Sequence, residues 1–319
     1  MVIYSKNLFH ADYMNKIYVS IGNGLGNQMF EYALFLGLKK KYKNTCVTTR
    51  LIFAGKKTDN RLTEPFGIEL ANNNESLWIK KRYPLKTASY KSIIKSVLYN
   101  VRGTIIPDSL FKGEGVISIC YRDGTLYREE VYSLEVDKHS YLLQSSFVNP
   151  EYFKPVAEQI RDVYRFRISD EFIKRDVFYD LIQASNSVSI HVRRGDYIKD
   201  GIYYLLDRKY YNKAINYINK RVSNPQFFVF SDDVTYAKKM FSEYKDFNYV
   251  TNEKNKDYED MYLMSCCKHN IIANSSFSFW GAYLGVYKKK IVVAPNKICS
   301  WSKNGIYCNN WYILNIEEL

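Results

Sequence analysis

The feature that most constrains the fold is a regular alternation of short apolar runs with longer amphipathic runs across residues 188–294. Short apolar runs are typical of buried strands, and apolar residues at helical spacing are typical of helices that cover a sheet. Strands that alternate with helices form a parallel sheet, so this half predicts a doubly wound α/β domain. The predicted strands are 188–192, 226–230, 249–250, 270–273 and 291–294, and the predicted helices are 210–221, 234–244, 258–267 and 277–286.

The N-terminal part begins with the same pattern. A strand at 17–21, a helix at 28–41 and a strand at 45–49 predict a βαβ unit. Residues 51–145 are less regular, and residues 150–182 favour helices that connect two halves.

A chain of 319 residues with 46% hydrophobic residues is long enough for two domains. We therefore expect an N-terminal α/β domain over residues 1–165 and a C-terminal α/β domain over residues 166–319.

Two adjacent arginines follow the predicted strand 188–192, in the run His191-Val-Arg-Arg-Gly-Asp196. Ligands bind at the carboxyl ends of strands in an open α/β sheet. Arginine offers a rigid fork of donors that matches phosphate oxygens. We therefore interpret Arg193 and Arg194 as part of a site for a diphosphate-bearing ligand. The alternative is a strand end with two solvated arginines and Asp196 as their local partner.

A glycine-rich loop, Gly22-Asn-Gly-Leu-Gly-Asn27, precedes the first predicted helix. Its G-x-G-x-G spacing, with no acid at the end of the next strand, does not fit a dinucleotide fingerprint, and the loop lacks the Lys-Ser/Thr of a P-loop. Gly24 and Gly26 still allow the backbone to approach a ligand closely. Asn27 and Gln28 carry amides that suit sugar hydroxyls. The alternative is a simple tight turn.

A polar turn, Asn274-Ser275-Ser276, lies between a predicted strand and a predicted helix. Backbone amides at a helix N-terminus bind anions, and serine hydroxyls add donors. The alternative is that one serine only caps the helix. Asp260, on the preceding helix, carries a carboxylate that could accept two hydrogen bonds from a guanine ring. The alternative there is an exposed helix acid.

The formal net charge of +13 favours an acidic partner such as nucleic acid, a membrane surface or a phosphate-rich substrate. The lysines occur in short groups such as 39–41 and 288–290, and the chain has neither zinc-finger spacing nor a recognisable RNA-binding signature. We therefore expect no nucleic-acid partner and a solvated basic face, with anionic lipid headgroups as a further partner.

The four histidines show no paired metal-binding spacing, and Ser231-Asp-Asp233 is not the Asp-x-Asp that holds manganese in one class of sugar-nucleotide enzymes. We expect no metal. The chain has no apolar run of 18 residues, and residues 1–15 do not form a signal peptide, so we expect a cytoplasmic protein with reduced cysteines. Cys299 and Cys308 could alternatively bridge a loop.

Taken together, four segments resemble the α-1,2-fucosyltransferases of glycosyltransferase family 11. Their order and spacing span nearly the whole chain. They are residues 24–30, 191–197, 228–233 and 260–284, and the last is long and specific.

The resemblance implies a GT-B fold, in which two Rossmann-like domains face each other across a cleft and the C-terminal one binds most of the donor. It implies GDP-β-L-fucose as donor, the 2-hydroxyl of a terminal β-galactoside as acceptor, inversion at the anomeric carbon and no required metal. It also implies a bacterial enzyme of surface polysaccharide (O-antigen-like) synthesis. The acceptor could be lipid-linked, with the protein resting on the cytoplasmic face of the inner membrane.

Residue roles follow from the resemblance. His191 would lie by the nucleotide, Arg193 would hold the β-phosphate, and Arg194 and Asp196 would buttress the loop. In α-1,6-fucosyltransferases an acid that contacts guanine lies sixteen positions before the second serine of a Ser-Ser turn, and Asp260 and Ser276 have that spacing. We expect a catalytic group of Arg193, Asn27 and Asp196, an acceptor group of Asn27, Gln28 and Glu31, and a donor group of His191, Arg193, Arg194, Asp260, Asn274, Ser275, Ser276, Gly24 and Gly26.

The general base stays open. Inverting transfer requires the acceptor hydroxyl to lose its proton, and Asp196, Glu31 and Asp200 are candidates. The other possibility is an SN1-like route in which the diphosphate takes the proton. Glu31 stands where the family often has Gln, and residues 143–153 follow the family only loosely, so acceptor specificity is the least constrained property. The competing hypotheses are a noncatalytic basic binding module and a transferase with another linkage or donor.

Overall fold

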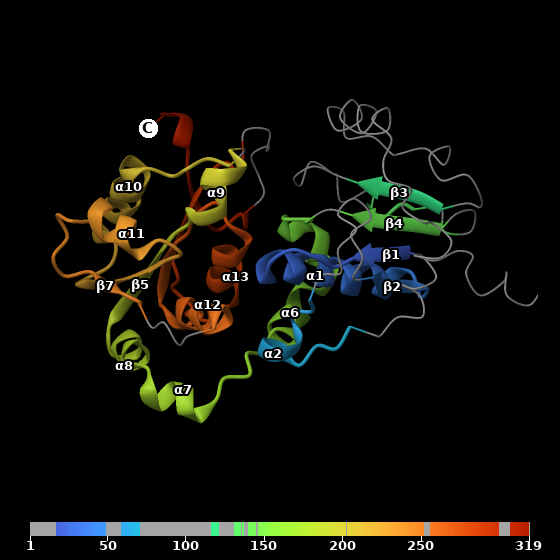
Figure 1. Cartoon of the computed structure of the whole chain (residues 1–319), viewed down its shortest axis with the longest axis horizontal. Coiled ribbons are helices and arrows are strands. Elements are labelled where there is room, and N and C mark those ends of the chain that lie inside the picture. Colours follow the sequence, from blue (N-terminus) through green and yellow to red (C-terminus); the bar gives the residue numbers. More distant parts are fainter. Residues whose placement is uncertain are drawn as a thin grey trace, which may run out of the picture. The chain divides into compact units, whose positions relative to one another are not determined.

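A computed structural model describes residues 17–48, 59–70, 116–120, 131–134, 136, 140–144, 146–201, 203–251, 256–299 and 307–318 (Figure 1). The chain divides into two units between Ile160 and Arg161, and residues 64–66 belong to the second unit. The predicted boundary between residues 165 and 166 lies a few residues further along the chain. Residues 1–15 and most of 51–145 lie outside the described residues, so the expectations about them are not addressed.

The first unit contains a parallel sheet with the strand order β2-β1-β4-β3. Its helix α1 (Leu25–Lys41) connects β1 to β2 and confirms the predicted βαβ unit. Three lysines in the last turn of α1 interact favourably with the negative C-terminal end of the helix dipole. The remaining elements are β1 (Ile17–Ser20), β2 (Thr45–Thr48), β3 (Val116–Cys120), β4 (Ser140–Gln144) and the 3₁₀ helix η2 (Pro150–Val156).

The second unit contains a six-stranded parallel sheet with the order β10-β9-β8-β5-β6-β7. Its strands are β5 (Asn186–Val192), β6 (Pro225–Ser231), β7 (Asn248–Tyr249), β8 (His269–Ile271), β9 (Val292–Pro295) and β10 (Tyr312–Leu314). Its helices are α2 (Thr63–Phe66), α7 (Asp170–Arg175), α8 (Val177–Ala184), α9 (Gly195–Asp200), α10 (Arg208–Asn219), α11 (Val234–Met240), α12 (Asp257–Cys266) and α13 (Ser276–Leu284), and α6 (Ala157–Val163) spans the change between the units.

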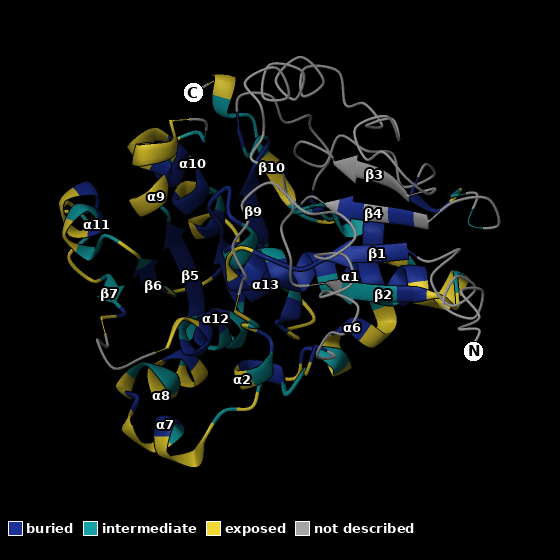
Figure 2. Cartoon of the chain, turned by 45° about the vertical axis from the view of Figure 1, so that its right-hand side comes forward, coloured by how far each residue is buried: buried dark blue, intermediate teal, exposed yellow. Residues whose placement is uncertain are grey.

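Both faces of the second sheet are covered. Alternate residues of β6 enter opposite cores, because successive side chains of a strand point to opposite faces. Phe227 and Val229 pack in the core formed with α10 and α11, whereas Phe228 and Phe230 pack with α8 and α12. In Figure 2 the central strands are correspondingly buried. The predicted α/β class with a doubly wound parallel sheet is therefore confirmed.

Side-chain caps explain where several helices begin. Ser169, Asp176, Asp207 and Asp233 each accept a backbone hydrogen bond at the start of α7, α8, α10 and α11. Aspartate and serine are among the residues most favoured at this position. Within the described part of the chain, no helix is both long and apolar enough to cross a bilayer.

Candidate functional site

Three polar segments of the second unit lie at one edge of its sheet. β5 and β6 pair in parallel with Val192 opposite Ser231, and β8 lies on the other side of β5. The segments that follow these strands, 193–196, 232–233 and 274–276, therefore leave the same carboxyl edge. This edge is where open α/β sheets bind ligands.

The Arg193 guanidinium is held by two carboxylates. Its Nη2 and Nε lie 2.8 Å and 3.0 Å from Oδ1 of Asp196, and its Nη1 lies 3.0 Å from Oδ2 of Asp232. Burial alone would lower the pKa of Arg193, but the hydrogen bond to Asp196 and the charge of Asp232 raise it overall. The guanidinium is thus a fixed positive charge at the sheet edge.

Asp232 also fixes the backbone of the loop that carries the arginines. Its two carboxylate oxygens accept hydrogen bonds from the backbone N–H of Arg194 at 2.9 Å and of Gly195 at 3.0 Å. A Cβ at Gly195 would lie 2.8 Å from Oδ2 of Asp232, so the loop fits closely around the carboxylate only with glycine there. No role was assigned to Asp232 from the sequence. Its position pointed to the site, because Asp232 follows the next predicted strand along the chain after the one that carries the arginines.

Arg194 is held by the start of the neighbouring helix. Its guanidinium lies 3.7 Å from the centre of the Tyr236 ring, and its Nε lies 3.5 Å from Oδ2 of Asp233. These contacts hold its side chain against α11 beside the Arg193 loop.

His191 lies at the end of β5, with only 4% of its surface exposed. Its ring packs beside Phe277, with 5.7 Å between ring centres. Burial first, and the positive charge of Arg193 second, lower the pKa of His191 to about 3. Its Nδ1 is buried and has no hydrogen-bond partner among the residues that the structure describes. His191 is therefore a neutral ring with one unused polar atom beside a fixed cation.

The 274–276 segment is firmly tied into the second unit. The Asn274 amide donates to the backbone oxygens of Tyr204 at 2.9 Å and Ile298 at 2.7 Å, and its own backbone oxygen accepts from the Tyr197 hydroxyl at 2.7 Å. Ser275 caps α13 by accepting from the N–H of Phe277. The structure thus shows a structural task for Asn274 and a capping task for Ser275.

Ser276 and Asp260 occupy equivalent places in two neighbouring helices. Ser276 begins α13, and Asp260 lies in the first turn of α12. Both helices run back along the sheet from its carboxyl edge, so their N-termini are directed to that edge. The two helices pack against each other.

The glycine-rich loop of the first unit leads into α1. Gly24 precedes the helix, is exposed, and has open space where a Cβ would lie. Its oxygen accepts hydrogen bonds at 3.1 Å from the N–H groups of both Asn27 and Gln28. Gly26 is buried, whereas Asn27 is half-buried in the first helical turn.

Side-chain hydrogen bonds of Gln28 and Glu31 hold the backbone of this loop. Gln28 Nε2 donates to the backbone oxygens of Asn23 and Asp59, and its Oε1 accepts from the N–H of Arg61. Glu31 is 1% exposed, and its Oε2 accepts from the N–H of Gly22 at 2.6 Å. Burial raises the pKa of Glu31 well above its usual value, which favours the neutral acid.

The other two candidate bases lie on α9. Asp196 is half-exposed and bound to Arg193, and Asp200 is exposed at the end of the helix. Among the residues described, no group of three or more His, Cys, Asp or Glu side chains could hold a metal ion. No disulfide joins the described cysteines, Cys299 and Cys308 included.

Comparisons with known proteins agree on one family. A protein from Escherichia coli named O-antigen biosynthesis glycosyltransferase WbnK is 29% identical over an alignment of 322 positions, which covers 92% of this chain and 99% of that protein. An α-1,2-colitosyltransferase from Escherichia coli is 30% identical over 293 residues, which cover 88% of this chain and 92% of that protein. The galactoside 2-α-L-fucosyltransferase Sec1 of Mus musculus is 34% identical over 110 residues, which cover 32% of this chain and 29% of that protein.

The sequence profile described as glycosyl transferase family 11 matches residues 131–315. This match includes the arginine loop, Asp232 and the 274–276 turn. The chain is therefore a member of glycosyl transferase family 11, as its sequence motifs indicated.

Proposed function

We propose that this glycosyltransferase moves L-fucose from GDP-β-L-fucose to the 2-hydroxyl of a terminal β-galactoside, with inversion, in O-antigen-like synthesis. The observation that carries the proposal is the fixed cation at the sheet edge, Arg193 clamped by two carboxylates beside the neutral, buried His191. The names of the relatives support the sugar, the linkage and the O-antigen setting.

Arg193 would bind the β-phosphate of the donor. A guanidinium has five N–H donors, and three of those of Arg193 are directed to Asp196 and Asp232. The other two would make the first contact with the phosphate, the donors that Asp196 then releases would complete the contact, and the positive charge of the guanidinium would stabilise the negative charge that develops on the departing GDP. Transfer would then need no metal ion.

Asp196 would change partner when the donor binds. Its side chain is 53% exposed, against 25% for Asp232, so it is the carboxylate that an incoming phosphate displaces more readily from Arg193. Once displaced, it could accept the proton of the acceptor hydroxyl. Asp196 would therefore hold Arg193 in the free enzyme and act as the base in the loaded enzyme.

His191 would contact a neutral part of the nucleotide. With a pKa of about 3 its ring carries no charge at neutral pH, so it cannot serve as a counter-ion for phosphate. Its buried Nδ1 would instead share a hydrogen bond with a hydroxyl or ring atom of the nucleoside. Asp260 and Ser276 would contact the guanine from the N-terminal ends of α12 and α13.

The first unit would present the acceptor through Asn27. Gln28 and Glu31 would act as positioning residues, since their polar atoms hold the backbone of the glycine-rich loop. The protein would work on the cytoplasmic face of the inner membrane, where its net charge of +13 suits lipid-linked acceptors.

Two variants test these roles separately. Arg193→Ala should weaken GDP binding in calorimetry and remove turnover, because the phosphate loses its cation. Asp196→Asn should bind GDP at least as tightly as the wild type but lower kcat, because it frees Arg193 and removes the base. Near-normal turnover of Arg193→Ala would contradict the phosphate role, and near-normal kcat of Asp196→Asn would contradict the base role.

The donor sugar is tested by offering two nucleotides. One relative is named for colitose transfer. Colitose is L-fucose without its 3-hydroxyl, so GDP-fucose and GDP-colitose differ at a single position. We expect GDP-fucose to give the higher kcat/KM. A clear preference for GDP-colitose would replace the proposed donor and leave the phosphate site intact.

A further inference from the structure

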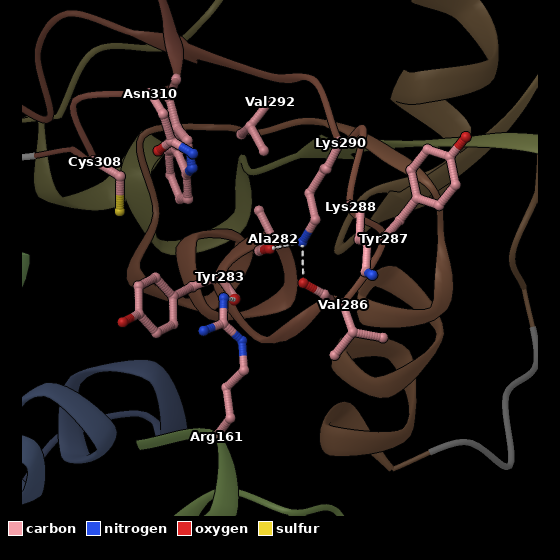
Figure 3. A pocket seen from close by; sticks show the side chains of 12 residues that line it. Arg161, Ala282, Tyr283, Val286, Tyr287, Lys288, Lys290, Val292, Cys308 and Asn310 are labelled. Carbon is pink, nitrogen blue, oxygen red and sulfur yellow. Dashed lines mark hydrogen bonds between the residues drawn. The ribbon is translucent and has the colours of Figure 1, made fainter. Parts of the chain in front are cut away.

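A pocket lies at the opposite end of α13 from the proposed donor site. α13 has nine residues and is therefore about 13 Å long. Its C-terminal end leads through residues 285–291 into β9, so this end is at the amino edge of the sheet. A pocket of about 350 Å³ opens here (Figure 3). It is lined by Arg161, Ala282, Tyr283, Gly285, Val286, Tyr287, Lys288, Lys290, Val292, Cys308, Asn310 and Trp311.

The lining of this pocket is strongly positive. It includes Arg161, Lys288 and Lys290 but no Asp or Glu. Figure 3 shows the Arg161 guanidinium beside Tyr283 and the Lys290 ammonium directed to the end of α13. Neighbouring positive charges without a carboxylate among them favour the binding of an anion.

Existing contacts hold two of the cations in place. Arg161 Nη2 donates to the backbone oxygen of Tyr283 at 3.0 Å, and the guanidinium lies 5.0 Å from the centre of the Tyr283 ring. Lys290 Nζ donates to the backbone oxygens of Ala282 and, at 2.6 Å, of Gly285. Burial, and then the charge of Arg161, lower the pKa of Lys290 to about 8.

We propose that this pocket binds a phosphate group carried on a small polar molecule or on a lipid headgroup. A volume of about 350 Å³ exceeds what a bare phosphate fills and lies in the range of small-molecule sites. The cations would hold the phosphate, and Tyr283 and Trp311 would pack against the attached sugar or glycerol. The site is separate from the proposed donor site and does not rest on the proposed function.

Cys308 provides a local reporter. Its thiol is half-buried in the pocket lining, and the described cysteines form no disulfide. A bound phosphate would cover the thiol and shield it from an alkylating reagent. We would measure the iodoacetamide alkylation rate of Cys308 by peptide mass spectrometry with glycerol phosphate, at an ionic strength matched with sodium chloride. The half-buried Cys266 serves as the internal control. We expect Cys308 alkylation to slow by about fivefold or more and Cys266 alkylation to stay constant.

A matched pair of lysine variants distinguishes binding in the pocket from general electrostatic attraction to the protein surface. Lys288 lines the pocket, whereas its exposed neighbour Lys289 does not. Lys288→Gln should raise the half-protecting concentration of glycerol phosphate by about tenfold, the loss expected when one charged partner is removed. Lys289→Gln should leave it within about twofold. Arg161→Gln should act like Lys288→Gln.

Vesicles identify the source of the phosphate. Protection of Cys308 by glycerol phosphate would show a site for soluble phosphate esters. Protection only by phosphatidylglycerol vesicles, and not by phosphatidylcholine vesicles, would show a lipid headgroup site. An unchanged alkylation rate with both probes, or equal loss of protection in Lys288→Gln and Lys289→Gln, would overturn the proposal.

Discussion

Replacement of Asp232 by asparagine tests whether the loop that carries Arg193 and Arg194 is held by one carboxylate. Asparagine has the same shape but only one oxygen. Asp232 accepts from the N–H groups of Arg194 and Gly195 and pairs with Arg193. In Asp232→Asn an N–H donor must therefore face one of these three donors.

The expected loss can be worked from these contacts. A hydrogen bond to a charged group is worth about 1.5–3 kcal/mol. The ion pair between Arg193 and Asp232, with side chains 31% and 25% exposed, adds about 0–1 kcal/mol. We take the total stabilisation lost in Asp232→Asn as about 2–3 kcal/mol. If the loop must keep this geometry to stabilise the transition state, kcat/KM falls about 30-fold to 160-fold.

The assay compares Asp232→Asn with Asp233→Asn. Asp233 caps α11, a position where asparagine is as good as aspartate, and its contact with Arg194 is 3.5 Å long. Asp233→Asn should therefore stay within about threefold of the wild type. Both variants are measured for transfer, for GDP binding and for thermal unfolding. A folded Asp232→Asn protein within about threefold of the wild type in kcat/KM would refute the reasoning.

Three further predictions concern Gly195, His191 and Glu31. Gly195→Ala should lower kcat/KM by about tenfold or more, because its Cβ would lie 2.8 Å from Asp232 Oδ2. The losses in Gly195→Ala and Asp232→Asn should not add in the double variant. Additive losses would show that the two residues act independently. The pKa of His191 is lowered to about 3, so below pH 6.5 the unfolded chain binds a proton that the folded chain does not. On acidification from pH 6.5 to 4.5 the wild type should lose about 1.4 kcal/mol more per pH unit than His191→Gln in urea unfolding, and parallel losses would contradict this. The raised pKa of Glu31 has the opposite sign: the folded chain keeps a proton that the unfolded chain loses above pH 4.5, so wild-type stability falls with rising pH until Glu31 ionises in the fold. Glu31→Gln cannot titrate and should become more stable relative to the wild type over that range, whereas a constant difference from pH 5 to 7 would argue against a raised pKa.

The sequence predicted the second unit well because its elements are long and regular. The strand that carries His191 and the strand before Asp232 lie within a residue or two of their predicted positions. Buried strands in a parallel sheet are apolar throughout, so their pattern is clear. The short elements α9 and β10 were not predicted. α9 is a single short helix after the arginines, and β10 is a three-residue edge strand with two exposed residues.

Site chemistry was harder to predict than site position. Residue types placed His191 and Arg193 at a strand end, but only the folded structure shows that Asp232 contacts both arginines and Gly195. Likewise, the sequence predicted that the Gln28 amide contacts the acceptor. In the fold it bonds to the backbone of Asn23, Asp59 and Arg61, contacts that depend on distant parts of the chain.

The pocket around Arg161 could not be predicted from the sequence. Its cations come from α6 and from the segment after α13, more than a hundred positions apart. Neither segment carries a motif, and only the packing of α13 brings them together. Such sites arise from tertiary placement, which periodicity and short motifs do not encode.

The most direct test of the central claim is acceptor-dependent release of GDP from GDP-fucose, measured with lactose, with lacto-N-biose and with no acceptor, all in EDTA. We predict release that requires an acceptor, survives EDTA and yields an α-1,2-linked product. GDP binding without release on any galactoside would contradict the proposed acceptor. Loss of turnover in EDTA that a divalent cation restores would contradict the role given to Arg193, and no binding of GDP at all would contradict the donor site itself.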